Sequence, residues 1–263
     1  MITLRRETHA PPGGATVGRP VYAIGDIHGC YDLLHALLAE IGRDAAARDP
    51  DRPALLIFCG DYIDRGPESA KVLAALAWLV RSNSVDVRLL EGNHEAMLRL
   101  FLKQPIQHRQ WLMRDGRFTL ESYGIAVPSE PPSPAEMIEL RDALLDHMPA
   151  SHHQLLRQLE LVVEYGDYAF VHAGIVPGVP IAKQERDDIL WIRREFLDYA
   201  KPFEKIIVHG HSWLDDRPMM RDNRLGIDTG AYETGVLTAA RISDDAVEVI
   251  QARREATLTQ EAA

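Results

Sequence analysis

Short apolar runs alternate with amphipathic stretches along the first hundred residues of the chain. The runs with the length and composition of buried β-strands are 21–24, 54–59 and 85–90. After each of them comes a polar turn and then a stretch with apolar residues at helical spacing, at 31–42, 68–81 and 95–103. Strand, loop and helix thus recur three times at the spacing of βαβ units, which predicts an α/β fold.

The pattern changes after residue 103. Residues 104–158 contain amphipathic helical stretches interrupted by a Pro-rich segment at 127–134, and they predict a helical cap inserted into the domain. Strand patterns return at 161–174, where Gly166-Asp167 is typical of a hairpin turn, and continue to residue 252. We expect one domain over 20–252, preceded by a flexible arm at 1–19 and followed by a frayed tail at 253–263.

Composition and charge narrow the class of protein. The 263 residues are 46% hydrophobic and 26% charged, which is typical of a globular domain, and the net charge of −10 argues against a broad basic surface for nucleic acid. The two cysteines, Cys30 and Cys59, form no CxxC pair, and no run has the length of a signal peptide core or a membrane span. The expectation is a soluble cytoplasmic protein that binds neither nucleic acid nor membrane; oligomeric state leaves no signal in the sequence.

Five polar clusters each follow an apolar run. They are GDIHG (25–29), GDYIDRG (60–66), GNHE (92–95), HAG (172–174) and HGHS (209–212). Asp, Asn and Gly are common at strand ends because they form turns, but turn formation does not require the histidines that four of the five clusters contain. In an α/β sheet the carboxyl ends of the strands line one edge, so we expect the clusters to converge there.

The side chains in these clusters are metal ligands by type. Aspartate, histidine and asparagine suit Mn²⁺, Fe or Zn²⁺. Asp26 and His28 alternate on an extended segment and can share one ion, whereas Asn93, His172 and His211 follow three other strands and can hold a second. Asp61 would bridge the two. Two cations about 3.5–4 Å apart clamp a phosphate and lower the pKa of a shared water to give a nucleophilic hydroxide.

The five clusters, in this order over about 21–242, resemble the signature of the phosphoprotein phosphatase (PPP) family of metallophosphoesterases, written GDxHG, GDxxDRG, GNHE, HAG and GH. The run WLMRDGRFTLESYG at 111–124 further resembles the bacterial, serine/threonine protein phosphatase-like branch. This resemblance implies a metallophosphoesterase fold: a central β-sandwich of mixed sheets flanked by helices, with the helical cap as an insert.

The same resemblance implies a role for each candidate residue. The first metal would be held by Asp26, His28 and Asp61, and the second by Asp61, Asn93, His172 and His211. His94 would be the general acid, and Asp64 would orient it and favour its imidazolium form. Arg65 and Arg193 would bind phosphate oxygens, with Arg194 as the alternative to Arg193. The metals would be two divalent ions, Mn²⁺ in first place and Fe or Zn²⁺ as alternatives.

Two positions are open to different interpretations. Eukaryotic members usually carry arginine directly before GNHE, where this chain has Glu91, so one positive phosphate contact is replaced by a negative charge. Asp228, at the end of RLGID, fits either a partner of the metal ligands or a turn residue.

The sequence is compatible with three functions. The preferred one is a metal-dependent phosphomonoesterase acting on phosphorylated protein or a small phosphoester, most specifically a serine/threonine phosphoprotein phosphatase. The alternative is a symmetrical dinucleoside tetraphosphatase or other pyrophosphohydrolase, whose members tend to lack the Asp of DRG and to read GNHD, where this chain has Asp64 and Glu95. A catalytically dead binding module is disfavoured because every ligand position and the acid are present.

Overall fold

The computed structural model describes residues 1–82 and 84–255, and its strands form two mixed sheets. The six-stranded sheet has the order β1 (Ile2–His9), β11 (Val247–Arg254), β10 (Val236–Ile242), β2 (Val21–Ile24), β3 (Ala54–Phe58) and β4 (Val85–Leu89). The five-stranded sheet has the order β5 (Val162–Tyr165), β6 (Tyr168–Val171), β7 (Ile206–His209), β9 (Arg224–Gly226) and β8 (Met219–Arg221).

Helices connect and cover these strands. The α-helices are α1 (Tyr31–Arg48), α2 (Ser69–Arg81), α3 (Asn93–Lys103), α4 (Arg109–Trp111), α5 (Arg117–Ser122), α6 (Pro134–His147), α7 (Ala150–Arg157), α8 (Arg186–Trp191), α9 (Arg194–Leu197) and α10 (Ala231–Thr234). The shorter turns of 3₁₀- or π-helix are η1 (Pro12–Gly14), η2 (Pro105–His108), η3 (Leu112–Gly116) and η4 (Ile181–Lys183).

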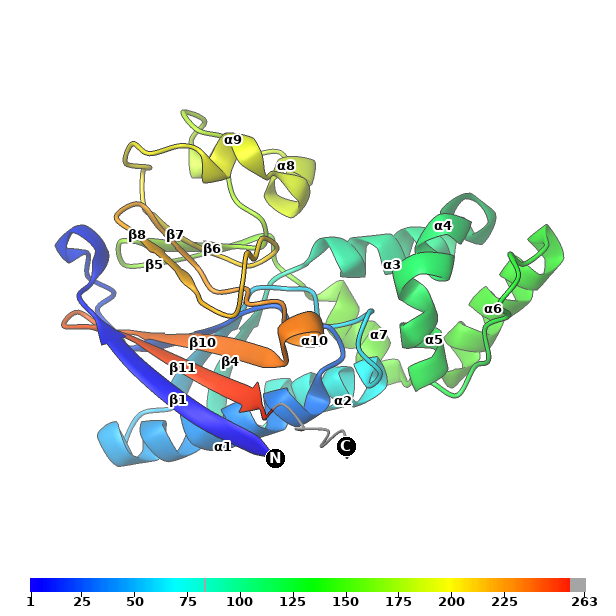
Figure 1. Ribbon diagram of the computed structural model, residues 1–263, viewed down its shortest axis with the longest axis horizontal. Coiled ribbons are helices and arrows are strands. Elements are labelled where there is room, and N and C mark those ends of the chain that lie inside the picture. The colour runs from blue at the N-terminus through cyan, green and yellow to red at the C-terminus, as the bar shows by residue number, and fades with distance from the viewer. Residues whose placement is uncertain (83, 256–263) are drawn as a thin grey trace, which may run out of the picture.

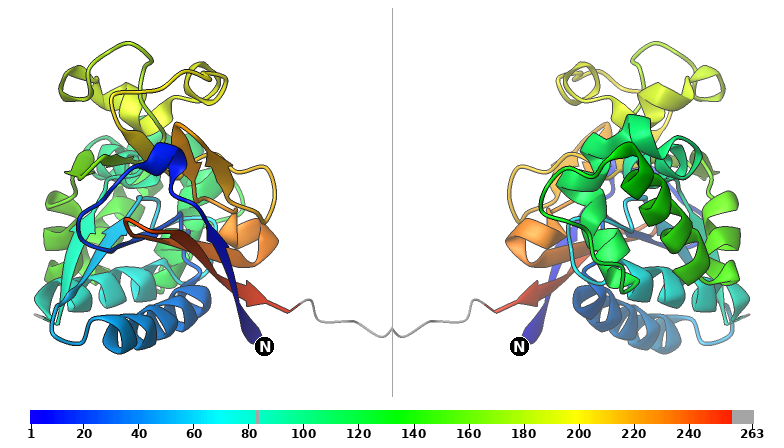
Figure 2. Two further views of the ribbon diagram at one scale, coloured as in Figure 1. Left: turned by 90° about the vertical axis from the view of Figure 1, so that its left-hand side faces the viewer. Right: turned by 90° about the vertical axis from the view of Figure 1, so that its right-hand side faces the viewer.

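The two sheets face each other, with helices on both outer sides (Figures 1 and 2). Helices α1 and α2 cover the six-stranded sheet, α8 and α9 lie over the five-stranded sheet, and α3 to α7 form a lobe beside the sandwich. The predicted α/β architecture, a sandwich of mixed sheets flanked by helices, is confirmed.

Alternate side chains of the inner strands pack into two apolar layers, one on each face of the six-stranded sheet. In β2, Val21 and Ala23 point between the two sheets, whereas Tyr22 and Ile24 pack against the α1–α2 side. A parallel strand that is buried on both faces is apolar at nearly every position, which is the pattern seen in the sequence. Full burial of each large apolar side chain contributes roughly 1.5–3 kcal/mol to folding.

Parallel pairing brings the polar clusters to a common edge. Strands β2, β3 and β4 are parallel and in register, so that Ile24 pairs with Phe58 and Phe58 with Leu89. Strands β6, β7 and β9 are likewise parallel in the second sheet. Because carboxyl ends of parallel strands lie together, the turns that follow these six strands meet at one end of the sandwich.

The expectation of a loose arm over residues 1–19 is wrong for its first part. All eight residues of β1 pair with β11 and form the edge of the six-stranded sheet. Arg6 also forms ion pairs with Glu40 and Asp44 of α1, which fix the strand to the helix layer. At the other end, β11 extends to Arg254, and residues 256–263 of the expected tail lie outside the described residues.

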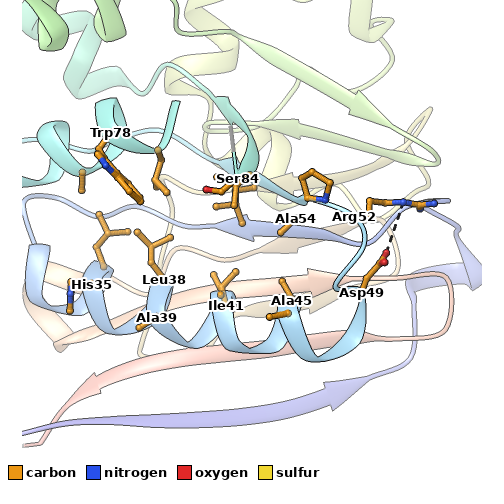
Figure 3. A pocket seen from close by; sticks show the side chains of 18 of the residues that line it. His35, Leu38, Ala39, Ile41, Ala45, Asp49, Arg52, Ala54, Trp78 and Ser84 are labelled. Carbon is orange, nitrogen blue, oxygen red and sulfur yellow. Dashed lines mark ion pairs between the residues drawn. The ribbon is translucent and has the colours of Figure 1, made fainter. Parts of the chain in front are cut away.

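The segment expected to be a helical cap, 104–158, contains helices and loops. It forms the lobe at the right of Figure 1. An apolar groove of about 970 Å³ between α1 and α2, with Trp78 and Leu38 in its wall, lies elsewhere and is lined by none of the predicted site residues (Figure 3). Among the described helices, none combines the length and the apolar character that crossing a membrane requires.

Candidate metal centre and catalytic site

Backbone strain marks the end of the sandwich where the polar clusters meet. In the described residues, positive φ angles at non-glycine positions occur at His28 (45°), Asp61 (51°), Asp64 (71°), Arg65 (65°) and His211 (63°). All five were singled out from the sequence as site residues. Such conformations cost of order 1–3 kcal/mol each and cluster at functional sites, where the surrounding structure enforces them.

Glu95 holds one of these strained turns in place. Its buried carboxylate accepts hydrogen bonds from the backbone N–H groups of Asp61 (2.9 Å), Tyr62 (2.8 Å) and Gly92 (3.0 Å). The turn after β3 is thereby fixed to the start of α3. Glu95 belongs to the GNHE cluster, but its role in fixing the turn was not predicted; its position three residues after Gly92, at a helix start, is the signal in the sequence.

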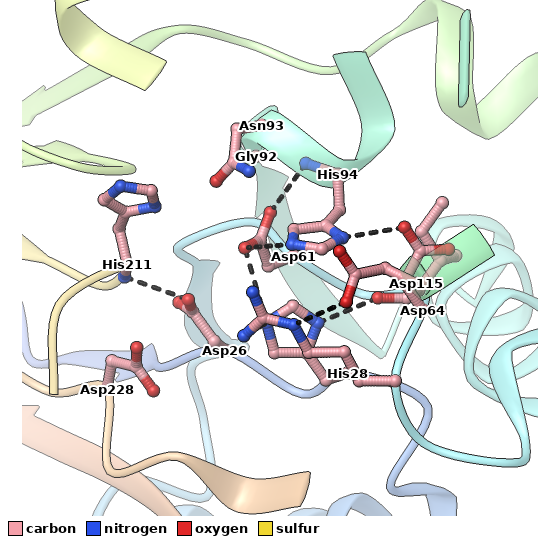
Figure 4. Close-up of polar contacts among 12 residues, drawn as sticks. Asp26, His28, Asp61, Asp64, Gly92, Asn93, His94, Asp115, His211 and Asp228 are labelled. Carbon is pink, nitrogen blue, oxygen red and sulfur yellow. Dashed lines mark hydrogen bonds and ion pairs between the residues drawn. The ribbon is translucent and has the colours of Figure 1, made fainter. Parts of the chain in front are cut away.

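One group of ligand atoms forms around Asp61, His28 and His94 (Figure 4). Oδ2 of Asp61 lies 3.4 Å from Nε2 of His28 and 3.9 Å from Nε2 of His94. Nδ1 of His28 donates to the carbonyl of Ile63 at 2.9 Å, which leaves Nε2 free to bind a cation. His94, predicted as the acid, therefore borders this group as well.

A second group shares Asp61 with His172 and His211. Nε2 of His172 lies 3.5 Å from Oδ1 of Asp61 and 2.9 Å from Oδ1 of Asn93. Nδ1 of His172 donates to the carbonyl of Cys59 at 2.8 Å, so this ring too presents Nε2 to the site. The bridging position predicted for Asp61 thus corresponds to a carboxylate that contacts both groups.

Asp26 lies beside the second group. Its Oδ2 accepts a hydrogen bond from the backbone N–H of His211 at 2.9 Å, and the two residues adjoin in Figure 4. Oδ1 of Asp26 and Nε2 of His211 are buried and have no hydrogen-bond partner among the described residues. Buried acceptors without partners are costly unless a cation or water occupies the space between them. The donor set and these two atoms fit divalent cations.

Two glycines allow this close packing. A Cβ atom on Gly210 would collide with the carboxylate of Asp26, and one on Gly92 would collide with the carboxylate of Asp61. Any larger residue at either position would displace a candidate ligand.

Burial sets the protonation of the candidate ligands. Burial lowers the pKa of His28 to about 3 and that of His211 to about 2, and it lowers the pKa of His172 as well. Burial and the charges of Asp228 and Asp61 raise the pKa of Asp26 well above its usual value. The imidazoles are therefore neutral at pH 7, the form that binds metal, and the crowded carboxylates need positive charge nearby.

His94 and Asp64 form a buried hydrogen-bonded pair. Nδ1 of His94 lies 2.7 Å from Oδ2 of Asp64. Burial alone would lower the pKa of His94, but the charge of Asp61 and the hydrogen bond to Asp64 outweigh it and raise this pKa to about 9. A protonated imidazole beside a metal-type site can donate a proton from Nε2.

The insert supports this pair from behind. Trp111 donates a hydrogen bond from Nε1 to Oδ2 of Asp64 at 2.7 Å, and Thr119 donates from Oγ1 to Oδ1 at 2.5 Å. Gly116 lets the indole of Trp111 pack against the backbone, because a Cβ there would meet the ring at 2.6 Å. The roles of Trp111 and Thr119 were not predicted, although both residues lie in the run 111–124 that resembles the bacterial branch of the family.

The two predicted phosphate-binding arginines lie on different sides of the centre. Arg65 has Nη1 3.4 Å from Nε2 of His28, and its guanidinium lies 4.6 Å from the centre of the Tyr232 ring. Arg193 is exposed, and its charge helps to lower the pKa of both His172 and His211. Arg65 therefore flanks the first group and Arg193 the second.

Asp228 fits both interpretations left open by the sequence. Its Oδ1 accepts a hydrogen bond from the backbone N–H of Gly230 at 2.9 Å, which is a turn contact. The same carboxylate is buried next to Asp26, and burial together with the charge of Asp61 raises its pKa to about 6.

Known proteins resemble this chain over most of its length. A family model described as calcineurin-like phosphoesterase matches residues 19–230. The chain is 31% identical to serine/threonine-protein phosphatase 1 of Salmonella typhimurium, over 85% of this chain and 92% of that protein. It is also 31% identical to the asymmetrical bis(5'-nucleosyl)-tetraphosphatase PrpE of Geobacillus thermodenitrificans, over 83% of this chain and 88% of that protein.

Solved structures share the fold at lower sequence identity. The crystal structure of a candidate diadenosine tetraphosphatase matches with a TM-score of 0.59 and 22% identity, over 90% of this chain and 95% of that one. A serine/threonine phosphatase from Saccharomyces cerevisiae matches with a TM-score of 0.50 and 14% identity, over 93% and 82% of the two chains. The chain is thus a calcineurin-like phosphoesterase and belongs to the PPP family of metallophosphoesterases.

Proposed function

We propose that this phosphoesterase hydrolyses phosphate monoesters and acts as a serine/threonine phosphoprotein phosphatase. The observation that carries the proposal is the 2.7 Å contact between His94 and Asp64, with the pKa of His94 raised to about 9. The serine or threonine alkoxide released from a monoester is a strong base and needs a proton as it leaves. The phosphate released from an anhydride is a weaker base and needs that proton far less.

In this proposal the residues divide into three tasks. The cations, Mn²⁺ by preference, would be held by Asp26, His28, Asp61, Asn93, His172 and His211. When bound, two such cations neutralise phosphate charge and supply a nucleophile from water at neutral pH. Arg65 and Arg193 bind phosphate oxygens and orient the ester for in-line attack.

The remaining task is proton transfer. Water oxygen forms the new bond to phosphorus, the bond from phosphorus to the ester oxygen breaks, and His94 gives its Nε2 proton to that oxygen. Asp64 keeps the imidazole oriented through Nδ1, and Trp111 and Thr119 keep Asp64 oriented. The two buried thiols, Cys30 and Cys59, suit a reducing compartment, and we place the enzyme in the cytoplasm.

A second candidate is hydrolysis of dinucleoside tetraphosphates. It is supported by the PrpE-type relatives and by Trp191, whose exposed indole lies 6.3 Å from the ring of His211 and offers a surface on which a nucleobase can stack. This candidate does not explain the pair of His94 and Asp64, because the leaving phosphate of an anhydride has little need of a proton donor.

A substrate panel with added Mn²⁺ tests the choice. We expect release of phosphate from phosphoserine and phosphothreonine peptides and from p-nitrophenyl phosphate, with no turnover by Asp61→Asn. Diadenosine tetraphosphate in the same panel reports on the second candidate through chromatography: two ADP indicate symmetrical cleavage, and ATP with AMP indicates asymmetrical cleavage. Efficient cleavage of the dinucleotide combined with inert phosphopeptides would contradict the proposal.

A further inference from the structure

Glu91, the residue that replaces the expected arginine, is paired with two arginines. Its side chain is only 4% exposed, and its two carboxylate oxygens lie 3.0 Å from Nη1 of Arg99 and 2.9 Å from Nη2 of Arg186. Arg99 comes from the second turn of α3 and Arg186 from the first residue of α8. The buried carboxylate therefore joins two guanidinium groups from different parts of the chain.

The trio carries excess positive charge with free donors. Two guanidinium groups and one carboxylate leave a net charge of about +1, because arginine stays protonated in proteins. The side chains of Arg99 and Arg186 are 40% and 39% exposed. Within residues 1–82 and 84–255, Arg99 has no other ion pair and Arg186 only a loose one of 3.8 Å to the exposed Asp187. Each planar fork therefore retains N–H groups that face solvent.

The positive charge of this trio lies near the candidate metal centre. Glu91 precedes Asn93 by two residues, so their Cα atoms are at most about 7.6 Å apart. Helix α8 is fixed to the same region, because the carbonyl of Ile189 accepts a hydrogen bond from the backbone N–H of Ala173 at 2.8 Å, directly after His172. Arg186 lies three residues before Ile189, a rise of about 4.5 Å along the helix. The residue that joins the two arginines thus lies two positions before Asn93, and the helix that carries Arg186 is fixed directly after His172.

We propose that Arg99 and Arg186, held together by Glu91, form a second anion subsite that binds an acidic side chain close in sequence to the phosphorylated residue of a peptide substrate. The inference rests on the proposed phosphoprotein phosphatase function and adds a substrate class to it. Residues of an extended peptide are about 3.3 Å apart, so a carboxylate one to three residues from the phosphoserine lies roughly 3–10 Å along the peptide from it. Guanidinium forks bind carboxylates with two parallel hydrogen bonds.

Glu91 holds the two arginines of this subsite together. Without a carboxylate between them, two guanidinium groups at this separation would repel each other and turn away. One negative charge against two positive ones also leaves a net charge that matches a single carboxylate. In place of the arginine that is missing before GNHE, the chain thus has a pair of arginines that binds an acidic residue near the phosphorylated one.

The experiment compares two phosphoserine peptides that differ only in flanking residues, Asp/Glu in one and Asn/Gln in the other, with p-nitrophenyl phosphate as the third substrate. For the unmodified enzyme we expect kcat/KM to be about tenfold higher for the acidic peptide. The ratio should fall to nearly one in the double variant Arg99→Gln/Arg186→Gln. The matched control is Arg88→Gln, since Arg88 is a similarly exposed arginine in a one-to-one pair with Glu160.

Each outcome bears on one claim. Equal turnover of the two peptides by the unmodified enzyme, or an unchanged ratio in the double variant, would overturn the subsite and leave the phosphatase proposal intact. Hydrolysis of p-nitrophenyl phosphate with neither peptide cleaved would overturn the proposed function and the subsite with it. The peptide comparison on the unmodified enzyme needs no variant, so a folding defect in the double variant does not prevent the test.

Discussion

The indole Nε1 of Trp111 donates a hydrogen bond to Oδ2 of Asp64 at 2.7 Å, on the same oxygen that His94 contacts. Trp111 belongs to the insert, and Asp64 to the turn after β3. The insert is thus part of the support of the proposed acid. Deletion of the insert should therefore slow the chemical step as well as change substrate preference.

Replacing Trp111 tests this support. Trp111→Phe keeps the apolar packing but removes one donor from a buried carboxylate, which costs roughly 1–3 kcal/mol of stability. We expect kcat to fall about tenfold because Asp64 holds His94 less firmly. Trp78→Phe is the control, since Trp78 is 61% exposed in α2 and should change neither quantity. Equal kcat in Trp111→Phe and Trp78→Phe would contradict the role of Trp111.

Removing the acid should affect substrates unequally. For His94→Asn we expect a loss of about 10²–10⁴ in kcat on a phosphothreonine peptide, because the alkoxide must then leave without a proton. The loss on p-nitrophenyl phosphate should be much smaller, because p-nitrophenolate is a good leaving group. Steady-state kinetics on the two substrates measure the difference, and losses of equal size would argue against His94 as the acid.

The pair should also set the alkaline side of the pH profile. The charge of Asp61 and the hydrogen bond to Asp64 raise the pKa of His94, so the protonated acid is present below that pKa and is lost as pH rises through it. In Asp64→Asn the hydrogen bond to a charged partner is gone and the pKa of His94 falls. The alkaline limb of kcat/KM should therefore move to lower pH. If the alkaline limb does not move, it reports the ionisation of a group other than His94.

Gly210→Ala should disrupt the centre at its closest contact. A Cβ atom there meets the carboxylate of Asp26, so we expect less bound Mn²⁺ and a loss of about 10² in kcat. Gly42→Ala is the control, because no atom lies within 4 Å of a Cβ at Gly42, in the middle of α1. That change should leave activity intact and stabilise the fold by roughly 0.5–1 kcal/mol. Metal content and thermal melting distinguish the two variants.

His152 predicts a pH dependence of stability far from the centre. Its ring is buried and hydrogen-bonded to the hydroxyl of Tyr123 at 2.7 Å, and burial lowers its pKa to about 4. Between pH 4 and about 6.5 the unfolded chain binds a proton that the folded protein does not. Stability therefore falls as pH decreases through this window, by up to about 3 kcal/mol, because each unit of pKa shift corresponds to about 1.4 kcal/mol. His152→Gln should reduce the slope, measured by urea unfolding; an identical slope would exclude this origin.

Much of the architecture could be predicted from apolar runs. Strands β2 and β3 are buried almost throughout and read as continuous apolar segments, whereas β4 shows the alternation of a half-exposed strand. The carboxyl ends of all three, and the polar turns of Asp26, Asp61 and Asn93, could therefore be placed in advance. Strand β1 could not, because it is an exposed edge strand whose sequence ITLRRETH lacks a buried face. Helix α10 has four residues, too few to show helical spacing.

The missing parts of the site are tertiary contacts. Neither the bond from Trp111 to Asp64 nor the pairing of Glu91 with Arg99 and Arg186 has a periodic signal, because the partners are brought together only by the folded chain. From the sequence, Glu91 was a negative charge near the phosphate. In the structure two arginines compensate it.

The central claim is that six side chains from both sheets hold a pair of cations with Asp61 between them. Anomalous diffraction at the manganese edge, from crystals grown with Mn²⁺, tests it most directly. We expect two peaks about 3.5–4 Å apart that share Asp61 as a ligand, with His28 beside one and His172 beside the other. Peaks elsewhere, or a single ion that Asp61 does not contact, would contradict it.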